Sequence, residues 1–186
     1  MPPKVRITRE EIIQSALELV RAEGKEAVNA RAVANALGCS TQPVFSNFST
    51  MEELEAAVNM AAYEHYLAFL RREVEGGKYP PYKAFGMAYV RFAKEEKALF
   101  NLLFLCDRRG QALYPNTDFE ESVNMIMQAG GLTEEQARLL HLEMWTCVHG
   151  IGTIMATSFL DLDWELVSTM LSDVYHGLMA RYGTEG

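Results

Sequence analysis

The sequence predicts an all-α protein of about nine helices. Nearly every segment repeats its apolar residues with a period close to 3.6, and Gly, Pro and capping residues separate these segments. No run of alternating β-branched residues predicts a strand. The chain has 186 residues, of which 49% are hydrophobic and 23% charged, so we expect one compact soluble unit or a small module joined to a larger one.

The first two helices are defined by their capping residues. Thr8 and Glu11 have the spacing of a capping box and are expected to begin the first helix, which Gly24 ends. Asn29 is the expected N-cap of a second, short helix that runs to Gly38. Both segments keep apolar residues on one side.

A third helix is expected after Ser40 as its N-cap, and together with the second helix it forms a helix-turn-helix. Pro43 falls in its first turn, where backbone N–H groups have no intrahelical acceptor. Val44 and Phe48 supply its apolar side. The other side carries uncharged hydrogen-bonding residues, namely Ser40, Thr41, Gln42, Ser46 and Asn47. Such a surface suits the major groove of DNA, and a helical hairpin with a polar solvent face is the alternative.

Longer helices follow, separated by Gly-Gly, Pro-Pro and capping sequences. The expected segments are a helix from Ser49 or Thr50 to residue 76, one or two helices over 82–106, a helix that ends at Gly130, a helix opened by the capping box of Thr133 and Gln136, and a last helix from Asp161 or Asp163. Residues 107–116 are expected to form a polar loop. We therefore divide the chain into a head, 1–50, and a body, 51–186.

The charge is divided unevenly between head and body. The net charge is −8, yet residues 1–48 carry six Lys or Arg against five Glu. A basic leading arm thus precedes an acidic body, which permits DNA binding through the head without demanding it. The acidic body favours a cationic or neutral apolar ligand over an anionic one.

The cysteines and the apolar segments indicate the cellular compartment that we expect for the protein. Cys39, Cys106 and Cys147 form no C-x-x-C pair, so we expect neither a zinc site nor a redox motif. The N-terminus lacks the apolar core of a signal peptide, and we expect a cytoplasmic protein. Residues 144–160 are uncharged but interrupted by polar residues, which favours a helix buried in protein over a membrane span.

Enzyme motifs are absent from the sequence. It contains no G-x-S-x-G, H-E-x-x-H, G-x-x-x-x-G-K or G-x-G-x-x-G sequence. We therefore expect no catalytic residues, no metal ion and no cofactor. A helical protein that binds small molecules or partners, with degenerate DNA contacts, is the remaining rival to a DNA-binding regulator.

The head resembles a known family of bacterial regulators. The resemblance covers about residues 6–56 and rests on five ordered runs: 8–13 (TREEII), 31–34 (RAVA), 37–40 (LGCS), 44–48 (VFSNF) and 52–54 (EEL). These look like the N-terminal domain of the tetracycline-repressor (TetR) type. The resemblance implies a three-helix DNA-binding head, a helical-bundle body that binds a ligand and dimerises, and release from a near-palindromic operator when a small, apolar effector binds.

The resemblance also implies which residues meet the DNA. The expected contacts are those of the third helix and of basic side chains that assist with phosphates: Lys4, Arg6, Arg9, Arg31, Ser40, Thr41, Gln42, Phe45, Ser46 and Asn47. Several positions depart from the family pattern: Asn47 stands where the family commonly has His, and a glycine common near Gln42 or Pro43 is missing. Phe45 stands where the family commonly has Tyr, and Met51 stands where it commonly has Lys, so we expect weaker phosphate anchoring. Repression is the expected mode of action, with activation as the alternative.

The body carries a second resemblance and two further expectations. The run 145–150 (WTCVHG) looks like the Trp/His/Gly signature of one C-terminal subgroup of this family. We expect a mostly apolar ligand pocket lined by Phe100, Phe104, His141, Trp145 and His149, with satisfied core histidines as the alternative. We expect a four-helix homodimer interface formed by Gly152, Ala156, Trp164, Val167, Leu171, Val174 and Leu178.

Overall fold

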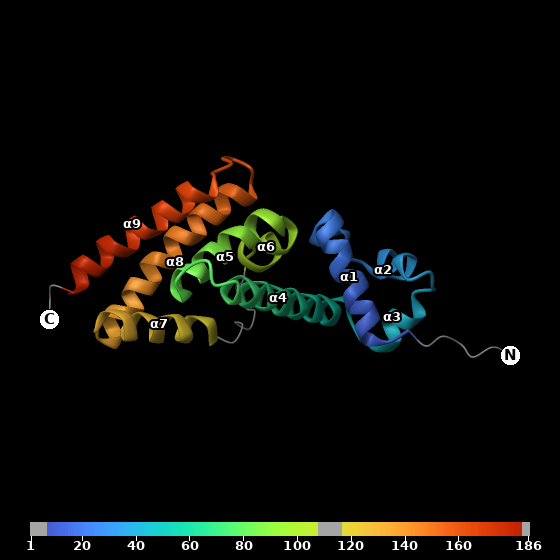
Figure 1. Cartoon of the computed structure of the whole chain (residues 1–186). Coiled ribbons are helices and arrows are strands. Elements are labelled where there is room, and N and C mark those ends of the chain that lie inside the picture. The colour runs from blue at the N-terminus through green and yellow to red at the C-terminus, as the bar shows by residue number, and fades with distance from the viewer. Residues whose placement is uncertain (1–6, 108–116, 184–186) are drawn as a thin grey trace. The chain divides into compact units, whose positions relative to one another are not determined.

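A computed structural model describes residues 7–107 and 117–183 of the chain. All regular structure within these ranges is helical (Figure 1), which confirms the all-α prediction. The described α-helices are α1 Arg9–Glu23, α2 Ala30–Ala36, α3 Gln42–Asn47, α4 Met51–Glu75, α5 Pro81–Glu95, α6 Lys97–Phe104, α7 Thr117–Gly130, α8 Glu134–Ala156 and α9 Trp164–Gly183, with one 3₁₀ turn at Lys25–Ala27.

Capping residues begin three of these helices as predicted. The Thr8 hydroxyl accepts a hydrogen bond from the Glu11 N–H at 3.2 Å, and the Glu11 carboxylate accepts one from the Thr8 N–H at 2.8 Å. Thr133 and Gln136 form the same reciprocal pair before α8. The Asn29 side chain accepts hydrogen bonds from two N–H groups of α2. These residues satisfy backbone donors that a helix leaves without partners at its N-terminus.

The structure corrects the predicted start of α3 and decides two alternatives that the sequence left open, the number of helices over 82–106 and the start of the last helix. Ser40 is not the N-cap of α3: the helix begins at Gln42 after Thr41, whose side chain makes no capping bond. Residues 82–106 form two helices because the backbone breaks at Glu96, with φ −116° and ψ 50°. Asp163 begins α9, since its carboxylate accepts a hydrogen bond from the Leu166 N–H at 2.8 Å.

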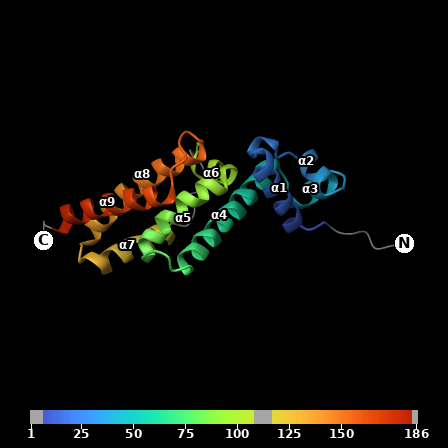
Figure 2. The same ribbon diagram turned by 45° about the horizontal axis from the view of Figure 1, so that its top comes forward.

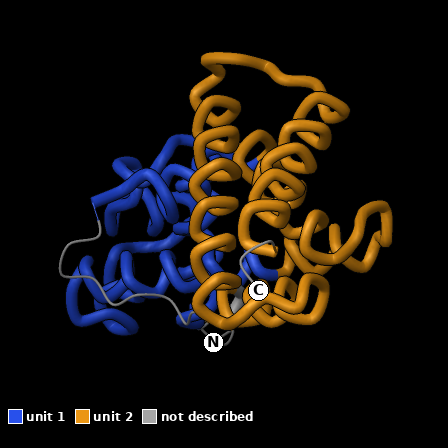
Figure 3. The backbone as a smooth tube through the Cα atoms, turned by 90° about the vertical axis from the view of Figure 1, so that its left-hand side faces the viewer, with its two compact units in different colours: residues 1–67, 96–107 blue, residues 68–95, 108–186 orange. Residues whose placement is uncertain are grey.

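The chain forms two compact units (Figure 3). Unit 1 consists of residues 1–67 and 96–107, and unit 2 of residues 68–95 and 108–186. The helix-turn-helix lies entirely in unit 1, whereas α5, α7, α8 and α9 lie in unit 2. The expected division at residue 50 does not coincide with the boundaries of these compact units, and it stays a prediction.

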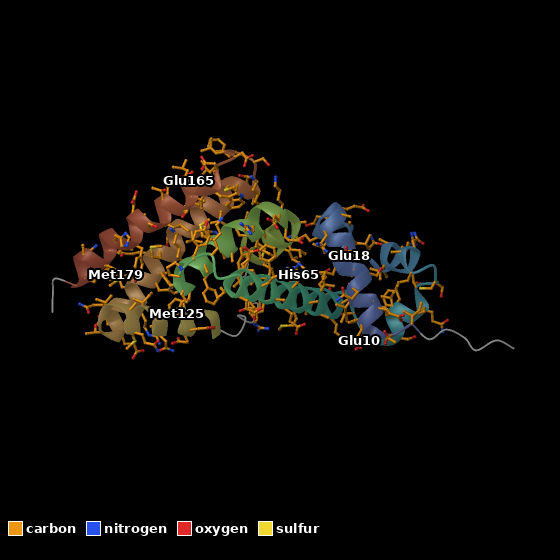
Figure 4. The ribbon with its side chains drawn as sticks, in the orientation of Figure 1. Glu10, Glu18, His65, Met125, Glu165 and Met179 are labelled. Carbon is orange, nitrogen blue, oxygen red and sulfur yellow. The ribbon has the colours of Figure 1, made fainter. Side chains whose placement is uncertain are left out.

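In unit 1, helix α1 packs against α2, α3 and α6. Its buried side chains Ile12, Ala16, Leu17 and Val20 follow the helical period that the sequence shows. A polar contact adds to this packing: Arg21 Nε donates to a Glu96 oxygen at 3.0 Å, and His65 Nε2 lies 3.5 Å from the other Glu96 oxygen. Figure 4 labels Glu18, a further Arg21 partner, and His65. Helix α1 is thus joined to α4 and to the start of α6.

In unit 2, helix α5 packs against α7, α8 and α9, and α8 lies side by side with α9 (Figures 1 and 2). Gly86 allows the close approach: a Cβ added there would lie 3.3 Å from Leu171 Cδ1 and 3.4 Å from Val148 Cγ2. No helix within the described ranges has the length and apolar character needed to cross a bilayer.

Candidate nucleic-acid interface

The helix-turn-helix is held together by small residues in its turn and apolar residues beneath it. Gly38 adopts φ +65°, a left-handed conformation that glycine accepts at little cost. The Cys39 N–H donates to the Ala34 carbonyl at 2.9 Å, which closes the turn after α2. Val44 and Phe48 are buried, as their predicted place on the apolar side of α3 requires. This packing leaves the opposite side of α3 facing solvent.

We call that opposite side, together with the end of the preceding turn, the outer surface of α3, and we define it by four exposed residues, Ser40, Gln42, Phe45 and Ser46. Phe45 is 55% exposed, an unusual position for a large aromatic ring in a folded protein. The Ser46 hydroxyl donates to the Gln42 carbonyl at 2.8 Å and keeps its oxygen lone pairs for an external donor. The outer surface of α3 therefore combines hydrogen-bonding groups with one apolar ring and carries no charge.

Two other residues predicted to contact DNA are less exposed to solvent. Thr41 and Asn47 are half-buried. The Asn47 amide donates to the Pro43 carbonyl at 2.8 Å, so part of its hydrogen-bonding capacity is used within α3. The side-chain carbonyl oxygen of Asn47 can still accept a hydrogen bond.

The four predicted basic contacts have different surroundings. Arg31 is exposed in the first turn of α2. Arg9 contacts three groups of unit 1 at the end of α3: the Asn47 carbonyl, Glu53 and the Phe48 ring. Lys4 and Arg6 lie outside the described residues.

The five predicted pocket residues belong to different units. Phe100 and Phe104 lie in unit 1, where their ring centroids are 5.3 Å apart and Phe100 is fully buried. His141, Trp145 and His149 lie on α8 in unit 2. No single compact unit therefore assembles all five.

Each of the two histidines on α8 bonds to a tyrosine of α5. Tyr89 Oη lies 2.8 Å from His149 Nδ1, and Tyr82 Oη lies 3.0 Å from His141 Nδ1. Trp145 stacks on His149 with ring centroids 4.9 Å apart and an interplanar angle of 12°. The sequence analysis missed both tyrosines. They are seven residues apart on α5 and face histidines eight residues apart on α8, a spacing that two helices packed side by side can match.

Burial keeps both imidazoles neutral at pH 7. Desolvation lowers the pKa of His141 to about 4 and also lowers the pKa of His149. Desolvation raises the pKa of the neighbouring Tyr82 phenol, so this hydroxyl stays protonated. Neutral histidines with tyrosine partners fit the alternative of satisfied core histidines, and they also offer polar groups at a half-exposed site.

This burial predicts an acid-sensitive stability. Because the pKa of His141 in the folded state lies below its unfolded value, the unfolded chain binds more protons, and stability is lost as the pH falls from about 7 towards 4. His141→Gln should weaken this loss in urea titrations at several pH values. Tyr82→Phe removes the hydroxyl but keeps the ring that covers His141, so it should retain the loss. Equal pH dependence in wild type and His141→Gln would contradict the assignment.

The predicted dimer residues are largely used inside unit 2. Gly152, Ala156, Val167 and Leu171 are buried within the chain, and Trp164, Val174 and Leu178 are half-buried. The reason is that α9 packs against both α5 and α8 of the same chain, with Leu171 against Gly86. The large apolar side chains left exposed on α8 and α9 are Leu139, Leu142, Trp145 and Leu166.

The sequence of this chain is similar to a known protein family and to a known transcriptional regulator. Residues 82–173 match the protein family described as "Tetracyclin repressor-like, C-terminal domain". The matched range includes the run 145–150. An uncharacterized HTH-type transcriptional regulator of Mycobacterium tuberculosis is 22% identical over 169 residues, which cover 88% of this chain and 78% of the relative.

Two solved structures share the fold. A protein of Vibrio parahaemolyticus assigned to the TetR family of transcriptional regulators matches with a TM-score of 0.67 and 15% identity, over 90% of this chain and 96% of its own. A transcriptional regulator of Rhodococcus sp. Rha1 matches with a TM-score of 0.63 and 18% identity, over 95% of this chain and 98% of its own.

Proposed function

Because this chain belongs to the tetracycline-repressor (TetR) type of transcriptional regulators, we propose that it is a ligand-responsive repressor that binds an operator through the outer surface of α3. The observation that carries the proposal is this surface itself: Gln42 and Ser46 are exposed on a short helix whose other side is buried, and Ser40 is exposed in the turn before it. Serine and glutamine side chains pair with base edges in the major groove.

Phosphate contacts are expected to be few. Phe45 has no hydroxyl, Met51 has no charge, and Arg9 is engaged within unit 1. Each neutralised phosphate adds about 0.9 to the slope of log affinity against log salt concentration. We therefore expect modest affinity and a slope shallower than about −8.

A gel shift tests DNA binding directly. The probes are a duplex from the region upstream of the protein's own gene and a duplex that the protein selects from a randomised library. A shifted band that a scrambled duplex does not compete away supports the proposal. If the protein enriches no duplex from the library and does not shift the upstream duplex at low salt, the rival remains, a helical binding protein with degenerate DNA contacts.

We propose that the repressor acts as a homodimer through the exposed apolar side chains of α8 and α9, centred on Leu139, Leu142 and Leu166. A pseudo-palindromic operator requires such a two-fold assembly. Half-exposed leucines on neighbouring helices are costly in water, and pairing two copies would cover them.

The dimer proposal predicts the effect of one substitution. Leu142, which is 50% exposed, can become Glu without disturbing the core of unit 2. Leu142→Glu should therefore fold normally and sediment as a monomer, because two carboxylates would face each other across the two-fold axis. Thr146→Glu, one turn further along α8, tests the extent of the surface. A Leu142→Glu variant that sediments as a dimer would rule out this surface.

We propose a small cationic or neutral apolar effector, bound near Trp145 and His149 of unit 2. The stacked Trp145 and His149 rings offer an aromatic face beside one polar group, and the acidic body disfavours anions. The effector can release DNA only if it binds the DNA-free conformation more tightly than the DNA-bound one. Screening small molecules for release of the shifted band, with Trp145→Phe as the test variant, would identify it.

A further inference from the structure

Arg9, the first residue of α1, makes three contacts at the junction of α3 and α4. Its Nη1 donates to the Asn47 carbonyl at 2.7 Å and to Glu53 Oε1 at 3.0 Å. Its guanidinium carbon lies 4.0 Å from the centroid of the Phe48 ring. The partners are 38 and 44 residues away in the sequence. One side chain thus links the start of α1 to the end of α3 and the first turn of α4.

The contact with Asn47 provides a hydrogen-bond donor for a carbonyl at the C-terminal end of α3. A helix leaves its last carbonyls without intrahelical donors and concentrates negative charge at that end. Because α3 has only six residues, it has little internal hydrogen bonding to hold its orientation. A positively charged donor on the Asn47 carbonyl both satisfies that group and opposes the charge at the end of α3.

Glu53 extends the contact to the beginning of α4. Its Oε2 accepts from the Ser49 N–H at 2.8 Å, and its own N–H donates to the Thr50 hydroxyl at 3.2 Å. The Ser49 N–H and the Arg9 side chain hold the pKa of Glu53 below its ordinary value, so the carboxylate is charged at neutral pH. Residues 47–53 are therefore fixed from both sides.

We propose that Arg9 is a positioning residue for DNA recognition, which sets the orientation of α3 through the Asn47 carbonyl and Glu53 and does not contact a phosphate. The inference deepens the proposed function and rests on it. It replaces the expectation that Arg9 assists with phosphates. Arg9 Nη1 already serves the Asn47 carbonyl and the Glu53 carboxylate, and the negative charge of Glu53 opposes the approach of a phosphate to this side chain.

The test compares Arg9→Gln, Arg9→Lys and Glu53→Gln with wild type on two probes: a duplex that the wild type selects from a randomised library, and a scrambled duplex of equal length. Affinities are measured at several salt concentrations, well below the melting temperature of each variant. Arg9→Gln should bind the selected duplex about tenfold more weakly, with an unchanged salt slope and an unchanged affinity for the scrambled duplex. Arg9→Lys should not restore binding, because a compact ammonium cannot lie flat on the Phe48 ring, as the planar guanidinium does, while it donates to the two acceptors.

Glu53→Gln separates the two possible roles of Arg9 by the sign of its effect. Removal of a carboxylate near DNA would strengthen binding if electrostatics alone mattered. If Glu53 holds Arg9 in place, Glu53→Gln should weaken binding to the selected duplex. A variant that combines Arg9→Gln with Glu53→Gln should then bind no more weakly than Arg9→Gln alone. Arg31→Gln is the matched control for a phosphate contact: it should weaken binding to both duplexes and make the salt slope shallower by about 0.9.

Three results would overturn the inference. If Arg9→Lys restores binding and Arg9→Gln behaves like Arg31→Gln, Arg9 contacts a phosphate. If the Arg9 variants melt earlier but bind the selected duplex as tightly as wild type, Arg9 only stabilises unit 1. If the wild type enriches no duplex, the proposed function fails and the role of Arg9 fails with it, a result that cannot be confused with the other two.

Discussion

Leu171→Glu should unfold unit 2 rather than merely separate two subunits. Leu171 is only 3% exposed and packs where α9 meets Gly86 of α5. A carboxylate at this position would be buried without a partner, which costs several kcal/mol against a total stability of about 5–15 kcal/mol for a typical domain. Circular dichroism during urea titration should show loss of helix at a much lower urea concentration than for wild type.

The matched control for this variant is Thr169→Glu, which places the same side chain on the exposed side of α9 two residues earlier. It should leave the urea midpoint nearly unchanged, since surface substitutions usually alter stability by about 0.5 kcal/mol or less. A folded, monomeric Leu171→Glu protein would contradict the packing described for unit 2 and would restore this residue to the subunit interface.

Phe45→Glu should abolish operator binding while it leaves the fold intact. The Phe45 ring is 55% exposed on α3, and its removal creates no cavity in unit 1. A carboxylate at the centre of the outer surface of α3 would face the negative charges of the duplex, and such like-charge contacts cost several kcal/mol. We expect at least about a hundredfold loss of affinity in fluorescence anisotropy.

Two further variants serve as controls for this prediction. Ala22→Glu adds the same charge to the exposed side of α1, about 20 Å along the helix from Arg9 and hence from the end of α3. It should reduce affinity only slightly. Phe45→Tyr restores the hydroxyl common in the family and should bind slightly more tightly than wild type. If Phe45→Glu binds the operator like wild type, the duplex does not meet this surface.

Local features of this chain could be predicted well from the sequence. Thr8 and Glu11, Asn29, and Thr133 and Gln136 cap helices where their spacing indicates, because capping depends on neighbours three residues away. The helix-turn-helix is equally local. Ser40 failed as a cap because α3 begins one residue later than the sequence suggested, so that Thr41 and not Ser40 directly precedes it.

Long-range contacts could not be predicted in the same way. The apolar stripe of α9 shows that Leu171 is covered but not by what, and α5 of the same chain covers it. A basic residue at the start of α1 resembles a phosphate contact, yet Arg9 meets partners about 40 residues away. The pairing of Tyr82 with His141 and of Tyr89 with His149 depends on the packing of α5 against α8, which the sequence does not reveal.

Methylation interference on the selected duplex tests most directly whether the outer surface of α3 reads the major groove. Methylation of guanine N7 adds a group to the floor of that groove, where Ser40, Gln42 and Ser46 would approach. We predict that N7 methylation blocks binding at two symmetry-related clusters, separated by about 10 base pairs or a multiple of it. Binding that tolerates N7 methylation at every guanine, but is lost when adenine N3 in the minor groove is methylated, would contradict the assignment of this surface.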